Sequence, residues 1–195
     1  MKKNLITAVL MTIAMTILLG LIYPLVITGL AQLFFRDKAN GQIIVRNGQA
    51  IGSRIIGQEF TDAKYFHSRP SAAGNGYDAA NSNGSQLGPT NQKLIDRVKS
   101  DVATLQRENP GQPIPVDMVT TSASGLDPDI SPANAEFQIP RVAKARGIPE
   151  ATVSALVQKY TAGRELGLLG EPRVNVLELN LALDDLAAKN LTAQR

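Results

Sequence analysis

Residues 5–35, LITAVLMTIAMTILLGLIYPLVITGLAQLFF, decide the architecture of this chain. These 31 residues carry no ionisable side chain except the phenol of Tyr23, and about 20 apolar residues in a helix are enough to cross a bilayer core. A helix of this length on the surface of a soluble protein would show a polar face, whereas the polar residues here are mostly threonines. The stretch therefore predicts a transmembrane helix.

A cleaved signal peptide is the alternative explanation of this segment. Lys2 and Lys3 give the chain a basic start, and residues 29–31 (Gly-Leu-Ala) resemble a cleavage site. The apolar part of a signal peptide is about 7–15 residues long, however, and this one is much longer. We therefore expect an anchor that stays in place: residues 1–36 form a tail and a transmembrane helix, and residues 37–195 form an extramembrane domain.

The charges of the chain argue against a nucleic-acid partner. The sequence has 20 Lys+Arg and 17 Asp+Glu, for a net charge of +3. Lys2, Lys3 and Arg36 flank the apolar stretch, which leaves 17 basic and 17 acidic residues in 37–195. A basic excess often indicates nucleic-acid binding, but here it belongs to the membrane flanks. The absence of cysteine excludes disulfides, thiolate catalysis and zinc sites with cysteine ligands.

Positive charges near the two helix ends indicate the orientation, although the bias is small: Lys2, Lys3 and the α-amine oppose Arg36 and Lys38. A short N-terminal tail is the easier part to leave inside with its lysines. We expect a single-pass protein whose N-terminus is cytoplasmic and whose C-terminal domain lies outside.

Small side chains recur at every fourth position on one side of the expected helix: Ala8, Thr12, Thr16 and Gly20. Such a stripe lets a partner helix approach closely, and threonine hydroxyls can bond across the contact. Small residues are also common in membrane helices without such a contact, so the stripe is compatible with both readings. Pro24 has no N–H for the carbonyl of Gly20, and we expect a kink there.

The rest of the chain predicts one soluble α+β domain. Asn47-Gly48 between apolar runs is the strongest short hairpin signal, and residues 42–60 are expected to be extended. Residues 116–121 are a possible short strand. Amphipathic helices are expected over residues 89–109 with Thr90 or Asn91 as the cap, from Ser131-Pro132 to Gly147 with an interruption at Pro140, from residues 149–150 onward, and after residues 173–177.

Residues 66–90 are rich in Gly, Asn and Ser and would suit a disordered linker. Bulky residues punctuate the segment, however, and a long loop in a compact domain is usually functional when it is ordered. We therefore expect an ordered functional loop. Because its backbone amides need partners that glycine cannot supply, polar residues are expected to hold it: Arg69, Asn83, Ser85 and Asn91.

No set of residues in the domain has the spacing of an active site. His67 could act as a general base for Ser68 or Ser71 only with an orienting carboxylate nearby, and no G-x-S-x-G motif is present. No cluster of His, Asp and Glu has metal-ligand spacing, and residues 127–129 (Asp-Pro-Asp) suit a turn or a cap. We expect no catalytic residue, metal site or bound cofactor. A membrane-anchored extracytoplasmic binding module or hydrolase is the alternative.

Short motifs follow one another through the chain: Tyr65-Phe66-x-x-Arg69-Pro70-Ser71-Ala72, Gly84-Ser85-x-Leu87-Gly88-Pro89-Thr90-Asn91, Thr120-x-Ser122-x-Ser124-Gly125-Leu126-Asp127-Pro128-x-Ile130-Ser131-Pro132 and Arg173-Val174-Asn175-Val176-Leu177-x-Leu179-Asn180. Together they closely resemble the KdpC family, the small C subunit of the bacterial Kdp potassium-transporting ATPase. Asp129 departs from the pattern, because members often have histidine there. The candidate site residues in the motif loops are Arg69, Asn83, Ser85, Asn91 and Asp127.

The resemblance implies an accessory subunit of a high-affinity, ATP-driven potassium uptake complex in the bacterial inner membrane. Its partners would be a channel-like potassium-binding subunit, a P-type ATP-hydrolysing subunit and the lipid bilayer, with ATP and K+ as ligands of the complex. The chain has neither the D-K-T-G motif of an aspartyl-phosphate nor a filter-type loop, in keeping with an accessory role. The family subunit is described as a catalytic chaperone that raises the affinity of the pump subunit for ATP. A domain outside the membrane could exert that effect only through the membrane helices.

Overall fold

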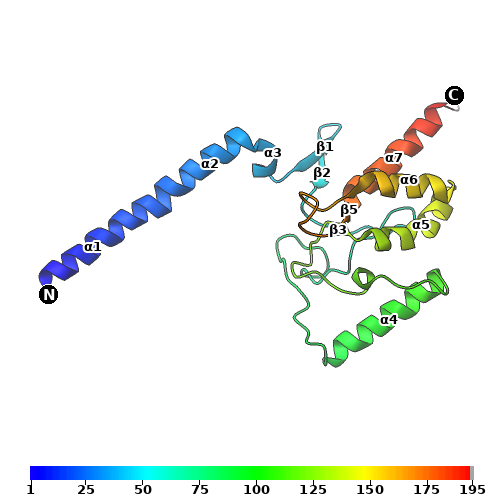
Figure 1. Cartoon of the computed structure of the whole chain (residues 1–195), viewed down its shortest axis with the longest axis horizontal. Helices are drawn as coiled ribbons and strands as arrows, with labels where there is room; N and C mark the ends of the chain where they lie inside the picture. The colour runs from blue at the N-terminus through cyan, green and yellow to red at the C-terminus, as the bar shows by residue number, and fades with distance from the viewer. Residues whose placement is uncertain (194–195) are drawn as a thin grey trace. The chain divides into compact units, whose positions relative to one another are not determined.

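The computed structural model describes residues 1–193, and the chain divides between Ile51 and Gly52 into two compact units. The first contains the apolar helix, and the second contains most of the α+β fold (Figure 1). The boundary expected after residue 36, between an anchor and an extramembrane domain, differs from this division and stays a prediction. Residues 194 and 195 of the expected domain lie outside the described part.

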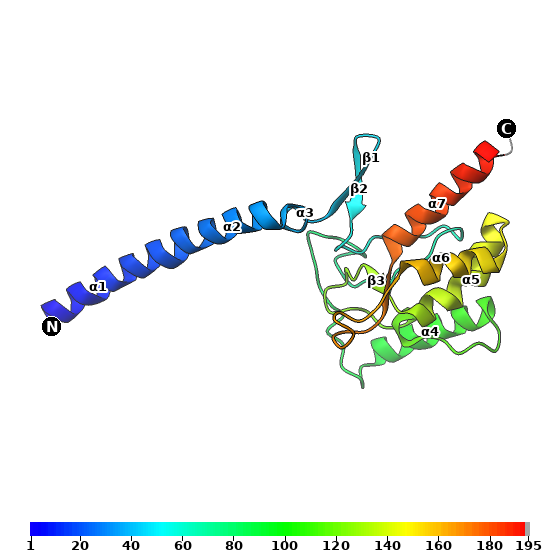
Figure 2. The same cartoon turned by 45° about the horizontal axis from the view of Figure 1, so that its top comes forward.

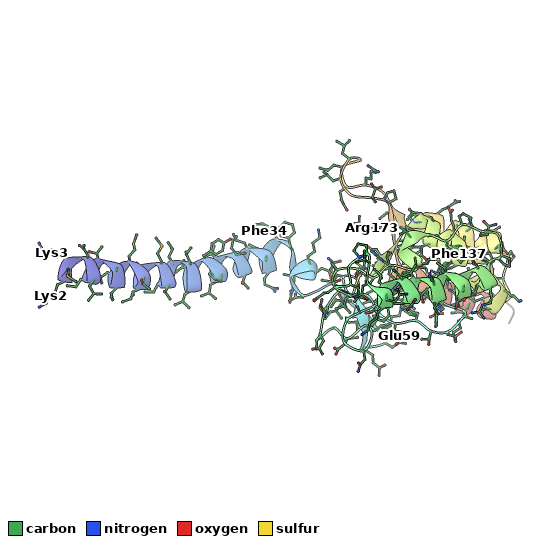
Figure 3. The ribbon with its side chains drawn as sticks, turned by 90° about the horizontal axis from the view of Figure 1, so that it is seen from below. Lys2, Lys3, Phe34, Glu59, Phe137 and Arg173 are labelled. Carbon is green, nitrogen blue, oxygen red and sulfur yellow. The ribbon has the colours of Figure 1, made fainter. Side chains whose placement is uncertain are left out.

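Within residues 1–193, one helix is long and apolar enough to cross a membrane, and it runs from Lys2 to Phe34. It has 33 residues, a mean hydropathy of 2.6 in its most apolar part and no buried residue. Figure 3 shows Lys2 and Lys3 at its start and Phe34 near its end, with side chains projecting all round. Such a helix in a soluble core would be covered by other elements. Its length and composition fit the predicted transmembrane helix.

The helix changes its hydrogen-bond pattern just before Pro24. Its parts are α1 (Lys2–Ile17), a π-helical turn (Leu18–Ile22) and α2 (Tyr23–Phe34). Pro24 has no N–H to offer, and the N–H of Tyr23 donates to the carbonyl of Leu18, five residues back. The structure therefore has a wider turn before the proline, through which the helix continues (Figure 2), and the kink expected at Pro24 stays a prediction.

A short helix and a hairpin follow. They are α3 (Arg36–Ala39) and the paired strands β1 (Ile43–Arg46) and β2 (Gln49–Ser53). Asn47 and Gly48 have φ angles of 51° and 77°, and a two-residue hairpin turn needs such positive values. The hairpin predicted at Asn47-Gly48 is confirmed, although the strand ends at Ser53 and the extended structure expected up to residue 60 is shorter.

Within residues 52–193, the second unit combines a three-stranded antiparallel sheet with four helices. The strand order is β3 (Asp129–Ile130), β5 (Arg173–Asn175), β4 (Thr161–Ala162). Val174 of the central strand lies opposite both Ile130 and Thr161. The helices are α4 (Gln92–Glu108), α5 (Pro132–Arg146), α6 (Glu150–Tyr160) and α7 (Val176–Ala193). This mixture confirms the predicted α+β class.

The core of this unit lies between the sheet and helices α5, α6 and α7, which pack side by side (Figure 2). Its side chains are almost all aliphatic, since Val and Ile suit strands and Leu and Ala suit helices. Phe66 differs in origin, because it comes from the glycine-rich segment and not from a helix or strand. The most enclosed residues are Phe66, Ile130, Ala135, Val142, Val153, Val174, Val176, Leu179 and Leu183.

Two local predictions are wrong. Helix α5 continues without a break, although Pro140 lies inside it. The proline removes only its own hydrogen bond, to the carbonyl of Glu136, and Glu136 is exposed, so water can serve that carbonyl. Residues 116–118 form a 3₁₀ turn instead of a strand, because the side chain of Asp117 turns inward and accepts hydrogen bonds from the N–H and hydroxyl of Ser131.

Candidate functional site

The start of the first motif is held by two buried side-chain amides. Asn180 from α7 accepts the N–H of Phe66 at 2.8 Å and donates to its carbonyl at 3.0 Å. Gln138 from α5 does the same for His67, also at 2.8 and 3.0 Å. The two amide residues are 1% and 2% exposed. Each of these side-chain amides binds both the N–H and the carbonyl of one backbone residue, as a neighbouring strand of a sheet would do.

A chain of buried polar groups continues from Gln138 into the third motif. Gln138 donates to the Asn134 side chain at 2.6 Å, and Asn134 donates to the Asp117 carboxyl group at 3.0 Å. Asp117 also binds Ser131, whose hydroxyl accepts the Asn134 N–H and so caps α5. Buried polar groups without partners are costly, and here each one partners the next. The network joins the first motif to the third through α5.

Arg141 and Arg146 of α5 cover the outer side of the same segment. Arg141 donates to backbone carbonyls that include that of Tyr65, at 3.0 Å. Arg146 donates to the Lys64 carbonyl at 2.6 Å, pairs with Asp184 of α7 at 2.9 Å and lies over the Tyr65 ring at 5.0 Å. The Tyr65 hydroxyl donates to Asp184 at 3.0 Å. The segment is therefore fixed from both α5 and α7.

Arg69 and Asp127, which come from two different motifs, form an ion pair. Arg69 Nη1 lies 2.8 Å from Asp127 Oδ2, and the two side chains are 24% and 30% exposed. The other terminal nitrogen, Nη2, reaches the carbonyls of Thr120 and Thr121 at 3.5 and 3.4 Å. Asp127 uses its second oxygen to accept the N–H of Asp129, as expected of a turn residue. The guanidinium group of Arg69 thus joins two loops through residues that are 58 positions apart in the sequence.

The glycine-rich loop and the loop of the third motif cross in close contact. Gly125 has a φ angle of 68°, and a Cβ there would lie 2.5 Å from the Asn83 carbonyl oxygen and 2.6 Å from the Ala73 nitrogen. Ser71 donates to the Gly125 carbonyl at 2.6 Å, and the Asn83 N–H donates to the Ser124 carbonyl at 2.9 Å. Only glycine fits at this crossing.

The remaining predicted loop residues lie away from the crossing or touch it only through backbone. Asn91 caps α4 by accepting the Lys93 N–H at 2.9 Å, as predicted. The side chain of Asn83 is exposed and accepts a hydrogen bond from Gln86 at 2.7 Å. Ser85 is half-buried, and its hydroxyl has no hydrogen-bond partner among residues 1–189, whose side chains the structure describes. That the predicted residues together order the loop stays a prediction.

The stripe of small residues lies on the apolar helix, and all its members are exposed: Ala8, Thr12, Thr16 and Gly20. A Cβ added to Gly20 would meet only the Thr16 methyl group, at 3.9 Å, which is an ordinary contact. The helix itself therefore does not require glycine there. Packing of this stripe against a partner helix stays a prediction.

Charged side chains from the motifs line a hollow of about 300 Å³: Arg69, Asp127, Asp129 and Arg173. Arg173 Nε lies 3.2 Å from Asp129 Oδ2, so the hollow holds this ion pair beside that of Arg69 and Asp127. Burial raises the pKa of Asp129, while a hydrogen bond from Asn175 and the charge of Arg173 oppose that rise. The hollow offers paired charges and hydrogen-bonding groups, which suit binding better than they suit bond-breaking chemistry.

The geometry around His67 does not favour nucleophilic catalysis. Its Nε2 lies 3.2 Å from the Asp62 carbonyl oxygen and 3.4 Å from Arg141 Nη1. Ser68 and Ser71 donate to backbone carbonyls instead. Burial, and then the charge of Arg141, lower the pKa of His67. In residues 1–193, no group of three or more His, Asp or Glu side chains is placed to hold a metal ion.

Sequence reasoning missed the buried amides. Asn134 and Gln138 are four residues apart, so they share one face of α5, and both are almost fully buried. Asn180 interrupts a leucine-rich run in α7. A polar side chain on an otherwise apolar helix face is a signal that could have drawn attention to these positions. Their backbone partners, 71 and 114 residues away for Gln138 and Asn180, could not be read from the sequence.

Comparison with known proteins covers both units and all the motifs. Residues 5–185 match the family described as KdpC: K+-transporting ATPase, c chain. Relatives named potassium-transporting ATPase KdpC subunit include that of Koribacter versatilis (strain Ellin345), 72% identical over 184 residues, which cover 94% of this chain and 95% of the relative. That of Acidobacterium capsulatum is 59% identical over 184 residues, 94% of this chain and 99% of the relative. That of Methylobacterium nodulans is 54% identical over 201 residues, 97% of this chain and 100% of the relative.

Proposed function

The chain belongs to the KdpC family, the c chain of K+-transporting ATPases, and we propose that it serves as a non-catalytic accessory subunit of a potassium uptake complex. Its partners in this proposal are a channel-like potassium-binding subunit and a P-type subunit that hydrolyses ATP. The apolar helix Lys2–Phe34 is the observation that carries the proposal. All its residues except the half-buried Ala31 are exposed, so that lipid and partner helices can cover them.

In this proposal the protein is a single-pass protein of the bacterial inner membrane that keeps residues 1–36. The N-terminus is cytoplasmic, and the domain lies outside. An intact mass that begins at Met1 would support the anchor, whereas a mature start at Gln32 would remove it. A reporter that is active only outside the cytoplasm should be active when it is fused after Arg195, and a reporter that is active only in the cytoplasm should be inactive there. Activity of the cytoplasmic reporter would show the opposite orientation.

We also propose that the chain acts as a catalytic chaperone that raises the affinity of the ATP-hydrolysing subunit for ATP. A domain outside the membrane cannot reach cytosolic ATP, so the effect has to pass through packed membrane helices. Such an effect is a coupling free energy between two sites, typically about 1–3 kcal/mol. Adding the chain should lower the dissociation constant of ATP from the ATP-hydrolysing subunit by roughly 5- to 150-fold, which equilibrium binding of ATP measures.

The test compares complexes of the two larger subunits assembled with and without this chain. We expect that leaving the chain out abolishes potassium-stimulated ATP hydrolysis, that adding the full chain restores it, and that a chain without residues 1–36 does not. Full potassium-dependent turnover without the chain would disprove the accessory role. The isolated domain would then be screened for a ligand that raises its unfolding temperature by mass action.

A further inference from the structure

The loop between strands β4 and β5 carries an exposed apolar tip. Leu166, Leu168 and Leu169 are 90%, 80% and 62% exposed, and we call these three residues the leucine tip. Figure 3 shows the loop that ends at Arg173 projecting from the body of the second unit. In residues 52–189, the part of this unit whose side chains the structure describes, the other large apolar side chain of similar exposure is Val116, at 71%. Single exposed apolar residues are normal on a protein surface, but a cluster indicates an interaction site.

Backbone hydrogen bonds fix the shape of this tip. Glu165 and Leu169 exchange two of them, at 2.8 and 2.9 Å, and the Leu168 N–H donates to the Glu165 carbonyl at 3.1 Å. Leu166 and Gly167 have φ angles of 53° and 75°, as in the tight turns of hairpins. Gly, Asn or Asp would adopt this conformation more easily than leucine. The backbone conformation of the turn therefore does not explain why position 166 is a leucine, whereas a contact made by its side chain would explain it.

The charges at the base of the tip are paired with one another. Arg164 lies 2.7 Å from Glu171, and Arg173 lies 3.0 Å from Glu165, so this part of the loop is neutral. Loops that bind a bilayer surface typically offer free Lys or Arg together with Trp or Tyr, and residues 163–172 contain no Trp, Tyr or Lys. Exposed leucines next to ion pairs suit an apolar pocket on another protein. The leucines would fill the pocket, and the ion pairs would lie at its polar rim with their charges already paired.

A second copy of this chain is a poorer occupant than a different subunit. Leucine is smaller than the aromatic side chains that bury about 150–250 Å² each, so three leucines fall short of the roughly 800 Å² per partner of a stable interface. Insertion of the tip into another copy would be a head-to-tail contact, which tends to grow into open chains. A small contact is sufficient, however, when another attachment already holds the two partners together.

We propose that the leucine tip inserts into an apolar pocket on a partner subunit of the same complex, on the side of the membrane where the domain lies. The inference rests on the proposed function, because the anchor helix supplies the first attachment in the complex. The tip would then be a second attachment that positions the domain on its partner.

Photocrosslinking in the full complex tests this inference. The photoreactive residue benzoylphenylalanine takes the place of Leu168 in one full-length chain and of Val116 in a matched control, each co-expressed with the two larger subunits. We expect Leu168 to give an adduct with a larger subunit at a much higher yield than Val116. Equal yields, an adduct with lipid or a second copy, or no adduct in a complex that still co-purifies would overturn the inference alone. Failure of the unsubstituted chain to co-purify would instead overturn the proposed function.

A second experiment measures the contribution of the tip to association. The triple variant Leu166→Ser, Leu168→Ser, Leu169→Ser should bind the purified pair of larger subunits at least about tenfold more weakly than the parent chain, because apolar burial is lost. Val116→Ser should bind like the parent chain. The melting temperatures of all three free chains should agree, since the substituted side chains are exposed. Unchanged binding by the triple variant would exclude the proposed insertion.

Discussion

The backbone of Phe66 and the side-chain amide of Asn180 exchange two hydrogen bonds, of 2.8 and 3.0 Å, in the core of the second unit. Both residues are at most 1% exposed. The pairing allows a segment that belongs to no sheet to place its aromatic ring in the core without leaving buried backbone groups unpaired. Because the two residues are 114 positions apart, the contact joins the glycine-rich segment to helix α7.

Removal of this amide should destabilise the protein strongly. Asn180→Ala leaves the N–H and the carbonyl of Phe66 buried without partners, at a cost of about 1–3 kcal/mol for each group. Gln158→Ala removes an exposed amide from α6 and should change the free energy of unfolding by less than about 0.5 kcal/mol. Urea unfolding of the chain in detergent measures both. Equal effects would mean that water replaces the Asn180 amide.

The loop crossing at Gly125 should not tolerate a methyl group. Gly111 offers a matched control, because its φ angle is 79° and a Cβ there would have nothing within 4 Å. Gly111→Ala should cost about 1–2 kcal/mol through backbone conformation alone. Gly125→Ala should cost roughly 1–3 kcal/mol more, because the new Cβ would overlap the backbone of Asn83 and Ala73. Similar melting temperatures for the two variants would show that the crossing adapts.

The ion pair between Arg69 and Asp127 should contribute more than an ordinary surface pair. Its control is Arg97 and Asp101 on α4, which lie 2.9 Å apart and are 30% and 34% exposed. Double-mutant cycles with alanine should give a coupling of roughly 1–2 kcal/mol for the first pair, because the carbonyls of the second loop already hold the Arg69 side chain in place and less side-chain entropy is lost on pairing. The helix pair should give about 0.3–0.5 kcal/mol. A smaller coupling for Arg69 and Asp127 than for the control would contradict this prediction.

His67 should make stability depend on pH. Burial and the nearby Arg141 charge lower its pKa in the folded state, so the folded state favours the neutral ring. The contribution of the neutral His67 ring to the free energy of unfolding is therefore present at pH values above the ordinary pKa of about 6.5. It is lost as the pH falls through the lowered pKa of the folded state. Unfolding free energies of the parent and of His67→Gln should differ most near pH 8 and less near pH 5. A difference that is constant with pH would exclude a lowered pKa.

Gly20 should matter for assembly and not for folding of the helix. Gly20→Leu adds a side chain that meets only the Thr16 methyl group within the helix, but it would block the approach of a partner helix. Contacts between membrane helices of this kind are worth about 1–2 kcal/mol, so co-purification with the larger subunits should fall by roughly tenfold. Gly29→Leu, outside the stripe, should co-purify like the parent chain. Equal recovery of both variants would favour a stripe without a partner.

Local signals predicted those elements whose cause lies within a few residues. Asn47-Gly48 forms its hairpin because both positions accept positive φ angles, and Asn91 caps α4 because its side chain reaches the N–H two residues on. The same reasoning failed at Pro140 and at residues 116–118. There, tertiary contacts outweigh local preference: buried side chains hold α5 together, and Asp117 is drawn inward by Ser131.

The sequence by itself determined the apolar helix long enough to cross a membrane, the α+β class and, through its motifs, the family, because apolar length, periodicity and motif spacing are properties of the chain in order. It named Arg69 and Asp127 as site residues without showing that they pair. Only the tertiary structure decided that Phe66, from a glycine-rich segment, enters the core, whereas Leu166 and Leu168 stay in solvent. The physical reason is that burial depends on contacts between segments that are distant in the sequence. The hydrophobicity of a side chain does not tell which distant segments will pack against it.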